Sequence, residues 1–215
     1  MRKGEGVLFN SAKDAAVIFV YVTQTKKHAL NGDAAALIQW LGAVYAAFDD
    51  VLRLEFNSSV IKIETQHDHF LAVCGILDPR DDAANVCVKA AVRMGRAIAG
   101  IMQPDGQPTV VKLGVAAGPL SGGVIGLEVP RFSVFGPPVV CAARMAMTAQ
   151  ESCSGSSVVH ISDRAAKNLT RSFLEDDCIV EGLTCGKRGK GMQIKGLGFQ
   201  QTWEVSSTFL CLSVP

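Results

Sequence analysis

The sequence feature that most constrains the fold is the uninterrupted apolar run VIFVYV at residues 17–22. Its β-branched and aromatic residues favour an extended strand. Successive side chains of a strand point to opposite faces, so a run without polar residues leaves neither face suited to water. The run therefore predicts a strand that is buried on both faces.

The segments that follow this run predict a defined order of elements. Apolar residues three or four apart predict amphipathic helices over 33–52 and 82–102. Between these helices, the segments SSVIKIET and HFLAVCGIL predict a hairpin that turns at residues 66–68. The strand TVVKLGVAAG at 109–118 completes the order β-α-β-β-α-β. This order predicts an α+β fold of ferredoxin-like type, with the helices on one face of the sheet.

The remainder of the chain predicts a C-terminal extension of this sheet. We expect a hairpin over 121–136, a helix over 138–150, the strand SSVVHIS, a helix over 163–169 and a final pair of strands. No internal repeat or low-complexity linker divides the chain. The expected organisation is an N-terminal extension at 1–14, one domain at 15–208 and a tail at 209–215.

Charge and composition exclude several classes of function. The 21 lysines and arginines against 20 aspartates and glutamates give a formal net charge of +1, too small to attract nucleic acid or an acidic membrane surface. The apolar run is far shorter than the roughly 20 residues of a membrane-spanning helix, so we expect no transmembrane segment. Seven cysteines without a C-x-x-C pair argue against a disulfide framework and a zinc site. They favour a reducing compartment, and we expect a cytoplasmic protein.

One continuous motif resembles a known family. The stretch VKLGVAAGPLSGGVIGLEVPRFSVFGPPVVCAARM is similar to the signature of the class III nucleotidyl cyclases, the adenylyl and guanylyl cyclase catalytic domains, without a gap from Gly114 to Met145. Upstream, VIKIETQHDHFLAV resembles the family's V-x-K-x-E-T-x-G-D motif, and downstream IKGLG resembles its K-G-x-G motif. The resemblance covers about residues 15–205.

The resemblance implies a reaction and a partner. In this family two carboxylates hold two Mg²⁺ or Mn²⁺ ions, which activate the ribose 3′-hydroxyl and neutralise the triphosphate for in-line attack, with release of pyrophosphate. A partner subunit supplies an asparagine that orients the ribose and an arginine that stabilises the transition state. The resemblance therefore implies a second cyclase-like domain as the partner, in a homodimer or a heterodimer, and GTP as a candidate ligand.

The metal-binding positions are only partly kept. Tyr21 stands where the family has its first metal carboxylate, and a phenol is a poor ligand for a hard cation at neutral pH. Asp68 occupies the second carboxylate position and is the predicted metal ligand. Its usual glycine neighbour is His67, a bulky residue at a tight turn. We expect His67 and His69 to point to one face of the hairpin and Asp68 to the other.

The remaining site positions are mixed in the same way. Glu64 stands where guanylyl cyclases place the glutamate that reads guanine, and Ser133 stands at the second base-reading position. Val140 replaces the ribose-orienting asparagine, whereas Arg144 matches the transition-state arginine. Lys195 matches the lysine that contacts the triphosphate. The predicted site is thus Arg144 for catalysis, and Glu64, Ser133 and Lys195 for substrate binding.

Three interpretations follow from this mixture. The preferred one is a guanylate-cyclase-like domain that forms one half of a cyclase-type dimer, converts GTP to cyclic GMP and pyrophosphate only with a partner, and is impaired or inactive alone. A second is a pseudoenzyme that serves as a structural or interaction module in a larger assembly. A third is an active homodimeric guanylate cyclase with substitute ligands.

Overall fold

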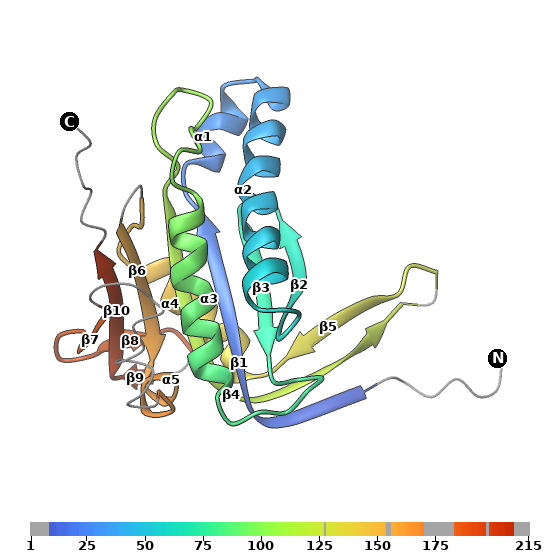
Figure 1. The fold of residues 1–215 in the computed structure, drawn as a ribbon, viewed down its shortest axis with the longest axis vertical. Helices are drawn as coiled ribbons and strands as arrows, with labels where there is room; N and C mark the ends of the chain where they lie inside the picture. The colour runs from blue at the N-terminus through green and yellow to red at the C-terminus, as the bar shows by residue number, and fades with distance from the viewer. Residues whose placement is uncertain (1–8, 127, 154–155, 170–182, 197, 209–215) are drawn as a thin grey trace.

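The computed structural model describes residues 9–126, 128–153, 156–169, 183–196 and 198–208. Within these residues, seven strands of one sheet follow the order β2-β3-β1-β4-β6-β10-β7 (Figure 1). Their bounds are β1 Phe9–Val22, β2 Val60–Gln66, β3 His69–Cys74, β4 Val111–Ile125, β6 Ser156–Ser162, β7 Leu183–Lys187 and β10 Thr202–Thr208. The first four form the predicted ferredoxin-like order, and β6, β10 and β7 extend it.

Two further strand pairings complete the described part of the chain. β5 (Arg131–Phe135) pairs antiparallel with the C-terminal part of β4. β8 (Met192–Ile194) and β9 (Gly198–Gln200) form a separate antiparallel pair. The sequence predicted one final pair of strands, whereas the structure has four strands there, β7, β8, β9 and β10. Glycines in the 182–198 segment allow the short turns between them.

Helices cover both faces of the sheet. The bounds are α1 Thr25–Leu30, α2 Ala34–Glu55, α3 Ala83–Ala97, α4 Pro137–Thr148 and α5 Asp163–Lys167. The two helices of the ferredoxin-like unit, α2 and α3, lie side by side on one face, as predicted (Figure 1). α4 packs against β1 and β4 on the other face.

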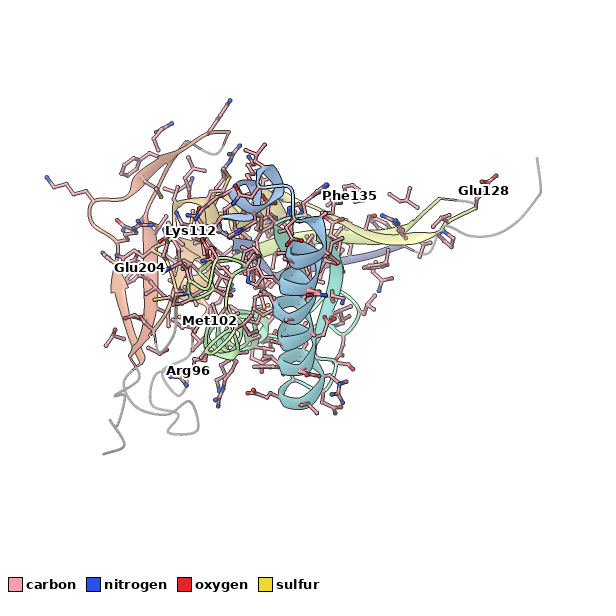
Figure 2. All side chains as sticks on the ribbon, turned by 90° about the horizontal axis from the view of Figure 1, so that it is seen from above. Arg96, Met102, Lys112, Glu128, Phe135 and Glu204 are labelled. Carbon is pink, nitrogen blue, oxygen red and sulfur yellow. The ribbon has the colours of Figure 1, made fainter. Side chains whose placement is uncertain are left out.

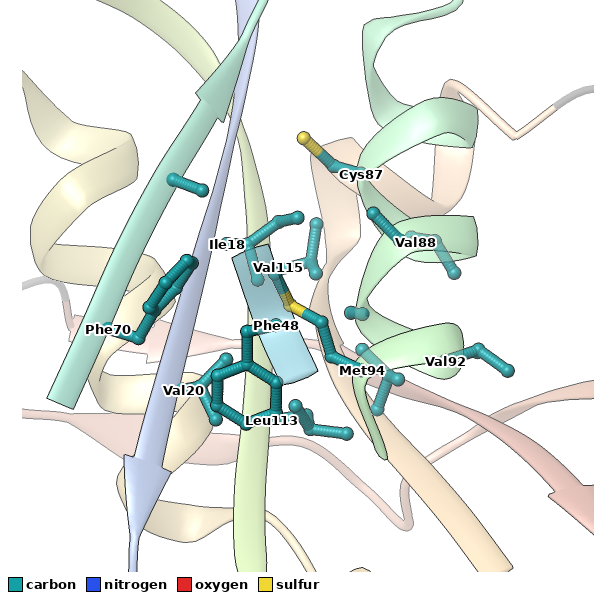
Figure 3. Close-up of a cluster of buried hydrophobic side chains, with 14 of the residues drawn as sticks. Ile18, Val20, Phe48, Phe70, Cys87, Val88, Val92, Met94, Leu113 and Val115 are labelled. Atoms are coloured by element: carbon teal, nitrogen blue, oxygen red, sulfur yellow. The ribbon is translucent and has the colours of Figure 1, made fainter. Parts of the chain in front are cut away.

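The alternation of β1 explains why both faces are covered. Ile18 and Val20 point toward α2 and α3, where they pack with Phe48, Phe70 and other apolar residues (Figure 3). Val17 points the other way and belongs to the cluster that contains Ala142 of α4. All of these side chains are fully buried. The prediction of a strand that is buried on both faces is confirmed.

Several element boundaries differ from the prediction. β1 begins at Phe9 and so includes residues assigned to the N-terminal extension, because a register shift at Ala12/Ala15 breaks the apolar pattern without ending the pairing with β4. β4 runs without a break from Val111 to Ile125. α3 ends at Ala97, five residues before the predicted end at Met102. Gly100, three residues after the end of α3, has a left-handed φ of 84°.

α1 was not predicted, because its six residues are too few to show a helical period. Among the described residues, α2 is the one helix with the length and apolar composition to cross a membrane. Its apolar stripe instead packs on the sheet, where Trp40, Val44 and Phe48 are buried. Trp40 also donates a hydrogen bond from Nε1 to Thr109 Oγ1 at 2.8 Å. These contacts account for the buried stripe of α2, whereas Ile38 and Leu54 of the same helix are 70% and 68% exposed.

The end of β4 and the whole of β5 form an arm that projects from the body of the molecule (Figures 1 and 2). Phe135 lies at the base of this arm and Glu128 near its tip (Figure 2). The arm exposes large apolar side chains, with Val129 at 69%, Phe135 at 57% and Ile125 at 55%. Such exposure along a projecting hairpin is typical of a surface that contacts another protein.

Candidate functional site

A pocket of about 310 Å³ lies at the junction of β1, β3, β4 and α4. It contains two of the positions singled out from the sequence, Tyr21 and Asp68. Its lining residues are Phe19, Tyr21, Lys26, Asp68, His69, Lys112, Ala143 and Met147. The pocket is on the α4 face of the sheet and combines an apolar wall with five polar or charged groups.

Strand register brings the central side chains together. Tyr21 of β1 lies opposite His69 of β3 on one side and opposite Lys112 of β4 on the other. Directly opposed residues share a face of the sheet, so these three form a row across three strands. Phe19, two residues before Tyr21, stacks on the imidazole of His69 with ring centroids 5.1 Å apart. The row therefore has a fixed apolar support.

The tight turn between β2 and β3 positions Asp68. Its carbonyl oxygen accepts a hydrogen bond from the Val22 backbone N–H at 2.7 Å, and the Tyr45 hydroxyl donates to the His67 carbonyl at 3.0 Å. His67 has a left-handed φ of 41°, a conformation that favours glycine. The predicted glycine-like turn thus forms around a bulky residue.

The predicted opposition of His69 and Asp68 is wrong, because both line the pocket. Residues 67 and 68 form the turn itself, so the alternation of a strand does not extend through them. His69 Nδ1 lies 3.4 Å from Asp68 Oδ1. The carboxylate is therefore partly engaged by its own neighbour.

Electrostatics keep Tyr21 in its neutral form. Burial raises the pKa of the Tyr21 phenol, and the negative charge and acceptor oxygens of Asp68 raise it further. Burial and the charge of Asp68 also raise the pKa of Tyr45. Tyr21 consequently offers the pocket an O–H donor and no anionic oxygen.

The residues of this pocket do not fit a pair of divalent cations. Asp68 is the one carboxylate in the lining, while Lys26 and Lys112 bring two ammonium groups. Mg²⁺ and Mn²⁺ favour several oxygen ligands with carboxylates among them. In the described part of the chain, no group of three or more His, Cys, Asp or Glu side chains is placed to hold a metal. Asp68 as a single metal ligand stays a prediction.

Two lysines of the pocket were missed by the sequence analysis. Lys112 could have been found from the sheet order, because it lies opposite Tyr21 once β1 and β4 are paired. Lys26 gave no signal, since its position depends on the left-handed Gln24, with φ 67°, which turns the chain from β1 into α1. Lys112 lies in the body of the molecule, far from the tip of the arm (Figure 2).

α4 carries the remaining predicted groups of the motif beside this pocket. Arg144 does not line the pocket, but its Nη1 lies 3.8 Å from the Sδ of Met147, which does. Val140 is 49% exposed. α4 approaches β4 closely because Gly114 has no side chain: a Cβ there would lie 2.3 Å from the Ala142 carbonyl oxygen. The helix thus holds Arg144, half-buried, beside the pocket and leaves Val140 exposed.

The three predicted substrate-binding residues lie on separate elements. Glu64 is on β2 and accepts a hydrogen bond from Gln66 Nε2 at 3.0 Å. Ser133 is half-buried on β5 opposite Gly123. Lys195 is exposed in the turn between β8 and β9. None of the three lines the pocket that contains Asp68.

A buried histidine, also missed from the sequence, fixes the C-terminal end of α4. The Nδ1 atom of His160 lies 3.0 Å from the Met145 carbonyl oxygen and 3.1 Å from Thr148 Oγ1. Arg188 Nη1 donates to the Thr148 carbonyl. Burial lowers the pKa of His160 to about 4, and the positive charge of Arg188 contributes to this shift. His160 is therefore neutral near pH 7.

Comparison with known proteins gives matches over nearly the whole chain. The family described as "Adenylate and Guanylate cyclase catalytic domain" matches residues 7–207. An adenylate cyclase of Mycobacterium tuberculosis is 26% identical over 197 residues, which is 92% of this chain and 40% of that protein. The chain thus spans less than half the length of this relative.

Solved structures show the same fold. The guanylate cyclase domain of RhGC from Catenaria anguillulae, determined in complex with GTP, matches with a TM-score of 0.76 and 22% identity, covering 93% of this chain and 98% of that one. A non-canonical dimeric guanylyl cyclase domain of the RhoGC fusion protein from Blastocladiella emersonii matches with a TM-score of 0.72 and 21% identity, covering 91% of this chain and 97% of that one.

Proposed function

Because the chain belongs to the family of adenylate and guanylate cyclase catalytic domains, we propose that it acts as one half of a cyclase-type dimer in cyclic nucleotide signalling. The proposed substrate is GTP, and the proposed products are cyclic GMP and pyrophosphate. The chain is impaired alone, since a complete site needs groups that this sequence has replaced.

One observation carries the proposal: Arg144 of α4 lies beside the pocket of its own chain without lining it, and its described side-chain contact is Met147 Sδ rather than an acidic group. An arginine in that position serves a site that a second chain completes. The exposed apolar residues of the arm and of α4, including Phe135 and Val140, provide a contact surface for such a chain. The Blastocladiella domain, determined as a non-canonical dimer and also as a monomer, is consistent with pairing between such domains but supports no particular arrangement.

Two replaced residues support the impairment. Tyr21 removes a carboxylate from the metal positions, and its raised pKa keeps the phenol neutral. Val140 removes the amide that would orient the ribose. Each loss removes several kcal/mol of transition-state stabilisation, about tenfold in rate for every 1.4 kcal/mol. The partner must therefore supply the metal carboxylates.

Guanine is favoured over adenine by the groups that remain. A carboxylate at Glu64 accepts hydrogen bonds from the N1 and N2 donors of guanine, which adenine lacks. Glu64 is half-buried and pairs with the flexible side chain of Gln66, so a ligand can replace this partner. The hydroxyl of Ser133 adds a donor or acceptor at the second base-reading position. The GTP complex of the Catenaria domain is consistent with this choice.

A repair experiment tests the proposed function. The double variant Tyr21→Asp/Val140→Asn is expected to bind GTP in a metal-dependent manner and to prefer it over ATP by calorimetry. In the same background, Glu64→Lys is expected to shift the preference toward ATP, whereas Asp50→Lys, which makes the same change of charge on the exposed side of α2, is the control. Equal affinity for GTP and ATP in the repaired variant would contradict guanine reading by Glu64.

A second candidate function is an interaction module without nucleotide chemistry. The exposed Val140, where the family has a polar residue, favours this reading because it makes the helix surface more apolar. A stable complex with another protein and no GTP affinity, even after repair, would select it. In either case we propose a cytoplasmic location, in keeping with the free thiols of the described cysteines.

A further inference from the structure

The pocket that contains Tyr21 has the charge of an anion site. Its lining holds two ammonium groups, Lys26 and Lys112, against the single carboxylate of Asp68. A site for two divalent cations requires the opposite balance, because each added positive group repels the metal. We propose that this pocket binds the phosphate groups of a di- or triphosphate directly, with Lys26 and Lys112 in the place of divalent metal ions.

The cross-strand row supplies the geometry for such a ligand. Lys112 and His69 flank Tyr21 at opposed positions of β4 and β3. The ammonium of Lys112 and the imidazole of His69 can donate hydrogen bonds to phosphate oxygens, whereas the Tyr21 phenol is hydrogen-bonded to Asp68. Ala143 and Met147 of α4 line the apolar side of the pocket. The donors for an anion therefore lie on the strand side of the pocket, opposite this apolar side.

The two lysines are available to a ligand. Lys112 makes an ion pair with Glu151, but the two atoms are 3.9 Å apart and the Glu151 side chain is 57% exposed, so this pair is weak. Lys26 is exposed, and no ion pair involves it among the residues that the structure describes. Neither ammonium group has to break a strong internal contact to bind an anion.

Asp68 is the one group of the pocket that opposes an anion. Its side chain is 19% exposed, and its Oδ1 lies 3.4 Å from His69 Nδ1. The adjacent Tyr21 phenol is a further partner for this carboxylate. The negative charge of Asp68 is thus turned toward its neighbours, while Lys26 and Lys112 leave the pocket with a net positive charge.

The volume of about 310 Å³ lies at the lower end of the range for small-molecule sites and suits a short chain of phosphates without a nucleoside. The inference rests on the proposed function in one respect: it treats this pocket as the phosphate end of the nucleotide site. It differs from the proposed function because it predicts that the phosphates bind without a divalent metal.

Titration calorimetry of the purified chain with inorganic triphosphate in excess EDTA tests the inference. We expect saturable binding, and we expect Lys26→Ala and Lys112→Ala each to raise the Kd at least tenfold. Lys190→Ala is the matched control, because it removes the same charge from a turn outside the pocket; its Kd is expected to equal that of the unchanged chain. Thermal unfolding of each variant checks that the fold is kept.

A substitution that adds a negative charge to the pocket provides a second test. Tyr21→Asp is expected to weaken triphosphate binding in EDTA at least tenfold and to restore a dependence on Mg²⁺. No binding of triphosphate in EDTA, binding that appears only with Mg²⁺, or unchanged affinity in both lysine variants would overturn the inference. A parallel titration with GTP separates the two proposals: GTP that binds only with Mg²⁺ refutes the metal-free pocket and leaves the proposed function standing. Triphosphate binding in EDTA without preference for GTP over ATP supports the pocket and argues against guanine recognition.

Discussion

Gly114 is the point at which the sheet and α4 come closest, and replacing it by alanine is the most direct test of this packing. A Cβ atom at residue 114 would lie 2.3 Å from the carbonyl oxygen of Ala142 and 2.3 Å from the backbone nitrogen of Ala146. Both contacts are far below 3.0 Å, and both involve helix backbone that cannot rotate away. Gly114→Ala therefore forces α4 off the sheet.

The magnitude follows from the kind of contact. Overpacking of a core by one methyl group costs about 1–3 kcal/mol, and backbone contacts place this variant at the upper end, about 3 kcal/mol. For a domain of this size each kcal/mol lowers Tm by roughly 2–4 °C, so we expect a decrease of roughly 6–12 °C. The displaced helix also moves Arg144 and Val140, so pairing should weaken.

Gly42 provides the matched control for this substitution. It lies inside α2, and a Cβ there would meet nothing within 4 Å. Gly42→Ala is expected to raise stability by about 1 kcal/mol, the difference in helix propensity between glycine and alanine. Differential scanning calorimetry and urea unfolding measure both variants. An equal or higher Tm for Gly114→Ala than for Gly42→Ala would refute the packing argument.

The remaining predictions concern pH and association. In the unfolded chain His160 binds a proton below about pH 6.5, whereas in the folded chain it stays neutral down to about pH 4. The free energy of unfolding should therefore fall as the pH decreases across this window, by roughly 2 kcal/mol between about pH 7 and about pH 5. Urea unfolding of His160→Gln should show a flatter pH dependence, and an unchanged slope would refute the assignment. Val140→Asp is expected to convert a dimer into a monomer, as measured by light scattering, with an unchanged Tm in thermal unfolding. Leu54→Asp, a substitution at another exposed apolar position, is expected to leave the dimer intact. A dimer that survives Val140→Asp would exclude α4 from the interface.

Much of the fold could be predicted from period and order alone. The buried run at 17–22, the helical stripe of α2 and the hairpin of β2 and β3 each carry a strong local pattern. The errors lie where local pattern and tertiary pairing differ. The outer part of β1 pairs with β4 through polar residues such as Asn10 and Ser11, and β4 continues past a glycine that would otherwise suggest a break.

The site could be predicted only in part, for a physical reason. A motif assigns residue types to positions, and so Tyr21, Asp68 and Arg144 were found from the sequence. Lys26 and Lys112 belong to the pocket because of a left-handed residue and a strand register, neither of which a motif describes. Glu64, Ser133 and Lys195 lie outside the pocket that contains Asp68, so their roles toward one ligand stay predictions.

We propose that this chain keeps the fold of a cyclase domain and lacks groups that complete the active site. Cyclic GMP formation tests it most directly, measured with GTP and Mn²⁺ for the unchanged chain and for Tyr21→Asp/Val140→Asn, at concentrations where light scattering shows a dimer. We expect the unchanged chain to form cyclic GMP at background level only, and the double variant to form cyclic GMP in a metal-dependent manner. Robust cyclic GMP formation by the unchanged chain, at the rate of the double variant or above it, would contradict the claim.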